Sequence, residues 1–146
     1  MKVLVDTNVV LDVFLKQAPF YKDSFVIFQL ADSKRISGVL ATVSLTNIFY
    51  LLRKAKKDPA EVYQIMDKLT ALFTVAPVVE TTVASALALR WKDFEDAVQF
   101  ITAKESNVEF IITRNKVDYK TSDIPCVSPA EFIAYLKEKE DNEKNV

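Results

Sequence analysis

The chain has 146 residues, a formal net charge of −1, 50% hydrophobic residues and 27% charged residues, which is typical of one soluble globular domain. It contains no histidine and one glycine. These absences exclude catalysis by Ser-His-Asp or Cys-His groups, the usual zinc sites and glycine-rich phosphate-binding loops. Any catalysis must therefore use carboxylate, amide, hydroxyl or basic side chains, with a hard cation if a metal takes part. The small net charge argues against strong non-specific binding of nucleic acid.

The sequence also favours a cytoplasmic protein. No apolar run approaches the roughly 20 residues that a membrane helix needs, so we expect no membrane partner. The apolar stretch at the N-terminus is interrupted by Asp6 and Asp12, which a secretory signal tolerates poorly. Cys126 is the only cysteine, and a single thiol is consistent with a reducing compartment.

The first half of the chain predicts two strands and four helices. Residues 2–6 (KVLVD) form an apolar, β-branched run that predicts a buried strand. Thr7 or Asn8 is then placed to cap a first helix. The remaining elements of this half are a helix over 20–33, a strand over 36–40, a helix over 44–56 and a helix over 58–72 that begins at Asp58-Pro59.

The second half continues the alternation of strands and helices. The expected elements are a strand over 73–79, helices over 82–91 and 93–106, strands over 109–113 and 125–127, and a helix from Ser128-Pro129 to about 139. We interpret residues 1–137 as a single domain and residues 138–146 as a charged, frayed tail. Apolar strands that alternate with helices predict an α/β fold with a parallel sheet covered on both faces. In such folds the ligand site lies beyond the carboxyl ends of the strands.

Acidic residues occur where that edge of the sheet is expected. Asp6 ends the first strand, Asp93 and Asp96 open the helix that leads into the fourth strand, and Asp118 follows the fourth strand. Gathered carboxylates repel one another, and a divalent cation relieves that repulsion by accepting their oxygens. A cation held in this way activates water and stabilises phosphate oxygens. The residue inventory therefore points to hydrolysis of a phosphodiester.

Each of these residues also has a purely structural interpretation. Asp6 can end its strand and cap the next helix, and Asp93 and Asp96 occupy positions that helix capping favours. Asp118 can be a solvated turn residue, and Arg114 a surface charge. The coincidence of acids at several strand ends favours the functional interpretation.

Two other groups are expected to be structural. The basic run 53–57 closes a helix, where cations suit the helix dipole, although contact with phosphate stays open. The aromatic residues expected in the core are Phe25, Phe28, Phe49 and Tyr50.

With these residues the chain resembles a PIN domain. Residues 3–12 (VLVDTNVVLD) resemble the start of that family, 42–47 its second motif, 93–97 (DFEDA) its third and 113–115 (TRN) its fourth. The resemblance spans nearly the whole chain. It implies a three-layer α/β/α fold around a five-stranded parallel sheet and ribonuclease activity that depends on Mg²⁺ or Mn²⁺. Many small bacterial members are toxins of toxin–antitoxin pairs, often dimeric, so the implied partners are RNA, an antitoxin protein and a second copy of the chain.

The resemblance also suggests roles for individual residues. The residues expected to hold the metal are Asp6, Asp96, Asn115 and Asp118. The residues expected to take part in catalysis are Asp6, Asp96, Asp118, Asp93 and Asn47. The residues expected to fix loop geometry and contact the substrate are Thr7, Asn8, Thr113 and Arg114.

Two departures from the family pattern leave alternatives open. Asn47 stands where the second motif commonly carries a Glu, and Asn115 stands where the fourth often carries an Asp. Amides coordinate cations more weakly, so the chain could instead be a non-catalytic PIN-like module that binds RNA or protein. A third hypothesis, a phosphotransferase of the haloacid dehalogenase type, needs a second Asp two residues after the first, where this chain has Asn8.

Overall fold

A central sheet of five parallel strands organises the computed structural model, which describes residues 1–119 and 121–146. The strands are β1 (Lys2–Val5), β2 (Ser37–Ala41), β3 (Thr74–Ala76), β4 (Phe110–Ile112) and β5 (Cys126–Val127), in the order β3-β2-β1-β4-β5. The predicted parallel α/β fold is therefore confirmed. The third strand is shorter than the predicted range 73–79 and ends before Pro77, which has no N–H to offer a neighbouring strand.

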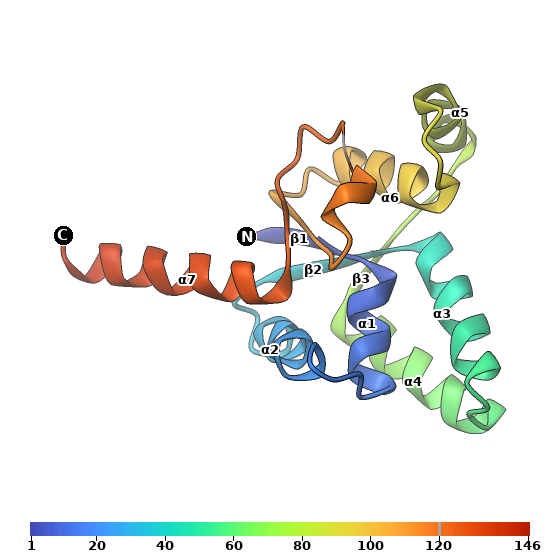
Figure 1. Ribbon diagram of the computed structural model, residues 1–146, viewed down its shortest axis with the longest axis horizontal. Coiled ribbons are helices and arrows are strands. Elements are labelled where there is room, and N and C mark those ends of the chain that lie inside the picture. The colour runs from blue at the N-terminus through green and yellow to red at the C-terminus, as the bar shows by residue number, and fades with distance from the viewer. Residues whose placement is uncertain (120) are drawn as a thin grey trace.

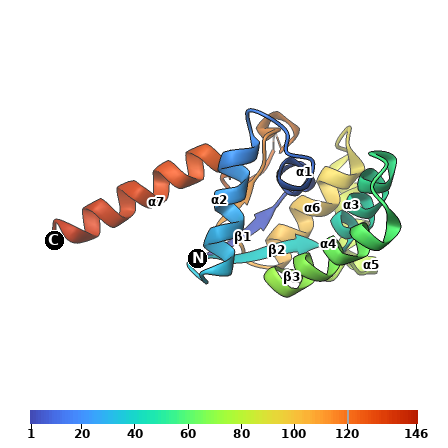
Figure 2. The same ribbon diagram turned by 90° about the horizontal axis from the view of Figure 1, so that it is seen from below.

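Helices cover both faces of this sheet. They are α1 (Thr7–Phe14), α2 (Tyr21–Asp32), α3 (Thr42–Lys54), α4 (Pro59–Leu72), α5 (Glu80–Leu89), α6 (Phe94–Glu105) and α7 (Pro129–Lys144), with a 3₁₀ helix, η1, over Lys116–Tyr119. In Figures 1 and 2, α1, α2 and α4 lie on one side of the strands and α5 and α6 on the other. Over the described ranges, no helix has the length and apolar character needed to cross a membrane.

The two faces explain why the strands are apolar runs. Val3 and Val5 of β1 pack into a core shared with α1, α2, α4 and α7. Leu4, between them, points to the opposite core, where it meets Phe100 and Ala103 of α6. Because successive side chains of a strand alternate between faces, a strand buried on both sides needs apolar residues at every position.

The strand order places a topological switch point between β1 and β4. The helices that follow β1 pack on one face of the sheet, and α5 and α6, which precede β4, pack on the other. At such a point the connections diverge and leave a crevice beyond the carboxyl ends of the two strands. Val5 is in register with Ile112, so Asp6 and Thr113 emerge side by side at that crevice.

The helix starts test the capping predictions. Asp58 accepts a hydrogen bond from Ala60 N ahead of Pro59, and Ser128 accepts one from Glu131 N, so both predicted starts are confirmed. The first helix differs, because it begins at Thr7 itself and residue 6 occupies the cap position. The prediction that Thr7 or Asn8 caps this helix was therefore wrong. Asp6 makes no side-chain capping hydrogen bond either, which leaves its carboxylate for other partners.

The last helix is longer than expected. It continues past residue 139 to Lys144, so most of the segment interpreted as a tail is helical. Arg35 forms an ion pair with Glu140 and ties this segment to the end of α2. Glu140 and Lys144 also have the i, i+4 spacing that supports an exposed helix.

Two aromatic residues expected in the core lie at the surface. Phe28 is buried, but Phe25 is 43% exposed and Tyr50 is 61% exposed, so the core prediction was wrong for these two. Phe25 instead lines an open groove between α1, α2 and α4.

Candidate active site

Asp6 is the centre of a buried hydrogen-bond network at the switch point. The residue is only 4% exposed, and its carboxylate accepts hydrogen bonds from four side-chain donors. Those donors are Gln99 Nε2 (3.0 Å), Thr113 Oγ1 (2.7 Å), Tyr119 OH (3.2 Å) and Asn8 Nδ2 (3.3 Å). Burial raises the pKa of Asp6, while the hydrogen bonds from Thr113 and Gln99 oppose that shift. The network fixes the orientation of the carboxylate and leaves it costly to ionise.

Asp96 is the second acid of the site and lies in the first turn of α6. Burial, followed by the negative charges around it, raises the pKa of Asp96 to about 7. Those charges are, in decreasing order of effect, Asp6, Asp93, Asp118 and Glu95. Like charges raise a carboxyl pKa appreciably only when they are close. The structure thus brings together all four predicted acids and adds Glu95, which the sequence did not single out.

Glu95 is held by polar groups of α1 and α3 and by a residue one turn farther along its own helix. Asn47 Nδ2 on α3 donates to its Oε2 at 2.7 Å, and Thr7 Oγ1 on α1 donates to its Oε1 at 3.1 Å. Gln99 Nε2 lies 3.5 Å from the same Oε1 and also donates to Asp6. Burial raises the pKa of Glu95, and the hydrogen bonds from Asn47 and Thr7 oppose this shift. Asn47, which stands where the family pattern commonly has a Glu, therefore contacts the acid Glu95.

The loop after β4 is attached to the start of α1. Asn8 Oδ1 accepts a hydrogen bond from Arg114 N at 3.3 Å, and Asn8 Nδ2 approaches Thr113 Oγ1 at 3.4 Å. Thr113 Oγ1 also accepts from Asn115 N at 3.0 Å. These contacts hold Thr113, itself fully buried, against Asp6.

Arg114 makes its closest contacts on the side of α1 and the loop before α2. Its Nε lies 2.8 Å from Asp12 Oδ2, and its guanidinium sits 4.1 Å from the centre of the Phe20 ring. Asp12 is fully buried and also accepts a hydrogen bond from Ser24 Oγ at 3.1 Å. Burial raises the pKa of Asp12, and the positive charge of Arg114 opposes that shift. This pair anchors the loop after β4, and a role of Arg114 toward a substrate stays a prediction.

The remaining predicted residues lie at the rim. Asp93 is exposed and caps α6 by accepting from Asp96 N at 3.1 Å, so its structural interpretation is confirmed. Asp118 lies in η1, where its backbone N donates to Asn115 O at 3.0 Å. The exposed residues Asp118 and Asn115 are therefore on one turn beside the buried Asp6 network.

The donor set suits a hard cation without forming a finished cage. Over the described residues, no three acidic or cysteine side chains already converge on one point. The negative charge of Asp6 raises the cost of ionising Asp96, and a cation removes that cost. Mg²⁺ in proteins is often bound through one or two carboxylates with water in its other positions. The open arrangement fits that mode of binding.

A family comparison agrees with this geometry. Residues 2–117 match the family model described as PIN domain. The chain belongs to the PIN domain family. A curated relative of this PIN domain, Ribonuclease VapC1 of Aquifex aeolicus (strain VF5), is 26% identical over 141 residues, which are 90% of this chain and 92% of the relative.

Solved structures share the fold at lower identity. VapBC-1 from nontypeable Haemophilus influenzae superposes with a TM-score of 0.67 at 15% identity, over 89% of this chain and 99% of that one. A toxin–antitoxin complex from Klebsiella pneumoniae superposes with a TM-score of 0.65 at 19% identity, over 87% of this chain and 97% of that one. Both similarities show that this PIN domain shares its fold with these proteins.

Sequence reasoning missed three residues of the Asp6 network. Glu95 was passed over beside Asp96, because an acid in the first turn of a helix is adequately explained by the helix dipole. Gln99 and Tyr119 were not considered. A signal for Gln99 was present, since it is the polar residue within the run Ala97-Val98-Gln99-Phe100, and a buried amide needs partners.

Proposed function

We propose that this PIN domain is an endoribonuclease that uses Mg²⁺ or Mn²⁺ to hydrolyse phosphodiester bonds of RNA. The observation that carries the proposal is the half-buried Asp96, whose pKa is raised by burial and by surrounding carboxylates to about 7. Folding an acid into such a position is unfavourable unless a positive charge joins it, so the arrangement favours a cation as its natural occupant. Similarity to a relative named as a ribonuclease supports RNA as the substrate.

Individual residues have distinct parts in this proposal. Asp6 and Asp96 would hold the metal, with Asp118 and Asn115 available from the rim for direct or water-mediated contact. A bound divalent cation lowers the pKa of a coordinated water and stabilises charge on the phosphate oxygens. Gln99, Thr113 and Tyr119 orient Asp6 through the hydrogen bonds described above.

Glu95 and Asn47 act together in the same proposal. The Asn47 amide holds Glu95 at 2.7 Å, so the site keeps an acid on this side although the second motif has lost its own. Burial raises the pKa of Glu95, which makes its carboxylate a stronger base toward a water molecule. Asp93 lies farther out and orients water at the rim. Thr7, Asn8 and Arg114 fix the loops on which a substrate phosphate would rest.

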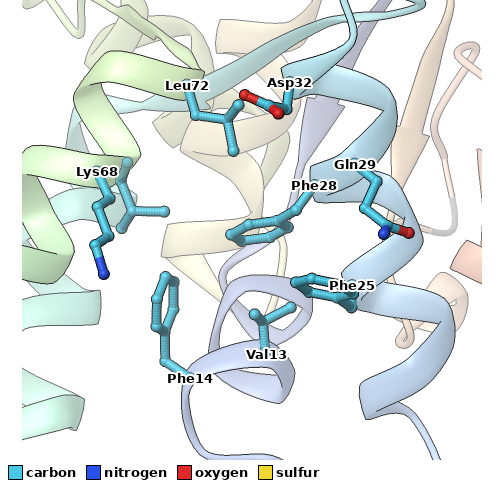
Figure 3. Close-up of a pocket in the computed structure, with 9 residues that line it drawn as sticks. Val13, Phe14, Phe25, Phe28, Gln29, Asp32, Lys68 and Leu72 are labelled. Carbon is cyan, nitrogen blue, oxygen red and sulfur yellow. The ribbon is translucent and has the colours of Figure 1, made fainter.

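An antitoxin is the protein partner that we propose for the chain. Structurally similar proteins include a toxin–antitoxin complex. The chain presents a groove of about 330 Å³ that is lined by Phe14, Phe25 and Phe28 together with Val13 and Leu72 (Figure 3). Lys68 and Asp32 stand at its rim. An apolar groove with a charged rim fits the apolar face of a helix, so we assign it to an antitoxin segment.

A non-catalytic module is the competing function. Asn47 and Asn115 carry no charge, and over the described residues the acids do not form a completed set of ligands. Such a domain would retain the fold and the RNA-binding surface without hydrolysis. Activity measurements separate the two functions.

The proposal is tested by incubating the purified, partner-free chain with a mixed RNA pool in Mn²⁺ and separately in EDTA. The variants are Asp96→Asn and Asp6→Asn, with the exposed Asp67 on α4 as the site of a matched control, Asp67→Asn. Circular dichroism verifies that each variant is folded. We expect fragments from the parent chain and from Asp67→Asn in Mn²⁺, at least 100-fold fewer from Asp96→Asn (about 2.7 kcal/mol of lost transition-state stabilisation), and none in EDTA.

Two results would count against the nuclease. Cleavage that persists in EDTA or in folded Asp96→Asn would place the chemistry elsewhere. No cleavage by the folded parent chain would favour the non-catalytic module.

A further inference from the structure

A pocket of about 280 Å³ opens beside the acids of the proposed site. It is lined by Trp91, Lys92, Asp93, Val117, Asp118 and Thr121. Asp93 and Asp118 are also among the charges that act on Asp96. The pocket is therefore continuous with the edge at which we place the reacting phosphate.

Trp91, which lines the pocket, belongs to an aromatic cluster. The Trp91 ring lies 5.1 Å from the Phe100 ring at an interplanar angle of 21°, and 5.9 Å from Tyr119 at 90°. Trp91 Nε1 donates to Thr121 Oγ1 at 2.9 Å, which fixes the plane of the indole. Tyr119 in turn donates to Asp6. Trp91 is thus held rigidly and is linked through one residue to the centre of the site.

One exposed apolar side chain stands among the charged residues that line the pocket. Val117 is 70% exposed although it lies between the charged residues Lys116 and Asp118. Lys92, which also lines the pocket, is exposed. An aromatic ring and an apolar side chain can contact the faces of an unpaired base, and a nearby cation can contact the phosphate of a single strand.

We propose that this pocket is a base-stacking subsite, in which Trp91 and Val117 contact one unpaired base of the RNA strand next to the scissile phosphate. The proposal rests on the ribonuclease function above and adds a site that determines how the strand is placed. Lys92 contacts a phosphate that flanks the stacked base. Double-stranded RNA, whose bases are already stacked on each other, is excluded from the pocket.

Trp91 is the only tryptophan in the chain, so its fluorescence reports directly on the pocket. The probe is a 2′-O-methyl RNA hexanucleotide in Mg²⁺, with its integrity checked on a gel and its binding measured in parallel by fluorescence anisotropy of a terminal dye. The comparison ligand is an abasic hexanucleotide with the same phosphates. Val117→Ser removes the apolar side chain, and Val79→Ser, at an exposed valine outside the pocket, is the matched control.

We expect saturable quenching of Trp91 by the hexanucleotide and none by the abasic strand. Val117→Ser should weaken binding by about 5-fold or more, the effect of losing about 1 kcal/mol of base stacking, while Val79→Ser leaves binding unchanged. Anisotropy that shows binding without quenching, equal quenching by the abasic strand, or equal weakening by both variants would overturn the subsite. So would a lack of any binding.

The cleavage test separates this inference from the function on which it rests. Metal-dependent cleavage without quenching of Trp91 would overturn the subsite and leave the nuclease intact. Quenching by the hexanucleotide without cleavage of any RNA would support the subsite in a non-catalytic module.

Discussion

Replacing Asp96 by Asn is expected to stabilise the metal-free protein. Burial first, and then neighbouring carboxylates, raise the pKa of Asp96 from 3.8 to about 7, which corresponds to about 4 kcal/mol of unfavourable ionisation in the folded state. Solvent reaches this half-buried residue and screens part of that cost. The variant also loses a helix-dipole interaction of about 0.5 kcal/mol. A net gain of about 2 kcal/mol remains at pH 8, or roughly 4–8 °C in Tm.

The sign of the pH dependence follows from the direction of the shift. A carboxyl whose pKa is higher in the folded state destabilises the fold when ionised, so the cost is fully present above about pH 7 and fades as the pH falls toward 3.8. The advantage of Asp96→Asn should therefore shrink between pH 8 and pH 4. In the described part of the chain the Asp96 carboxylate accepts no hydrogen bond from a side chain, so the variant loses no such partner.

Thermal unfolding followed by circular dichroism in EDTA measures this difference. Asp67→Asn on the exposed face of α4 serves as the control and should leave Tm unchanged. Addition of Mn²⁺ should raise the Tm of the parent chain and leave that of Asp96→Asn unaltered. A variant that is no more stable than the parent at pH 8 would refute the electrostatic argument.

Three further changes test other parts of the structure. Asn47→Glu replaces the amide that donates to Glu95 at 2.7 Å by a second carboxylate. The variant should have a lower Tm without metal and should bind Mn²⁺ more tightly in calorimetry. Unchanged affinity for Mn²⁺ would place residue 47 away from the metal. Asp12→Ala leaves Arg114 without its counter-charge. Urea unfolding should show that the free energy of unfolding falls by about 2–4 kcal/mol. A fall below about 0.5 kcal/mol would mean that this ion pair does not anchor the loop after β4. Gly38→Ala places a Cβ against the Phe73 ring and should lower the free energy of unfolding by about 1–3 kcal/mol in the same assay. No loss would show that the Phe73 ring moves freely.

The sequence was sufficient to predict the fold because its signals are local. Apolar strands, the Asp58-Pro59 and Ser128-Pro129 helix starts and the alternation of elements all depend on residues close together in the chain. The position of Asp6 followed from the rule that parallel strands present their ligand site at their carboxyl ends. The absence of a capping hydrogen bond from Asp6 could not be predicted. An acid directly before a helix suits a helix cap and a buried hydrogen-bond network equally well.

The contacts of the site depend on residues far apart in the chain. Glu95 is held by Asn47, 48 residues away, and Asp6 by Gln99, 93 residues away. No periodicity in one sequence reports such pairs. The exposure of Phe25 was missed for a related reason, since a helical pattern shows which residues share a face but not whether another element covers it.

The central claim is that the edge formed by Asp6 and Asp96 holds a divalent cation. Crystals of the chain grown with Mn²⁺, and measured for anomalous scattering, test this most directly. We expect one strong anomalous peak about 2.2 Å from a carboxylate oxygen of Asp6 or Asp96, with the other carboxylate within reach directly or through water. Data from a folded, Mn²⁺-saturated crystal with no peak at this edge, or with a peak elsewhere, would contradict it.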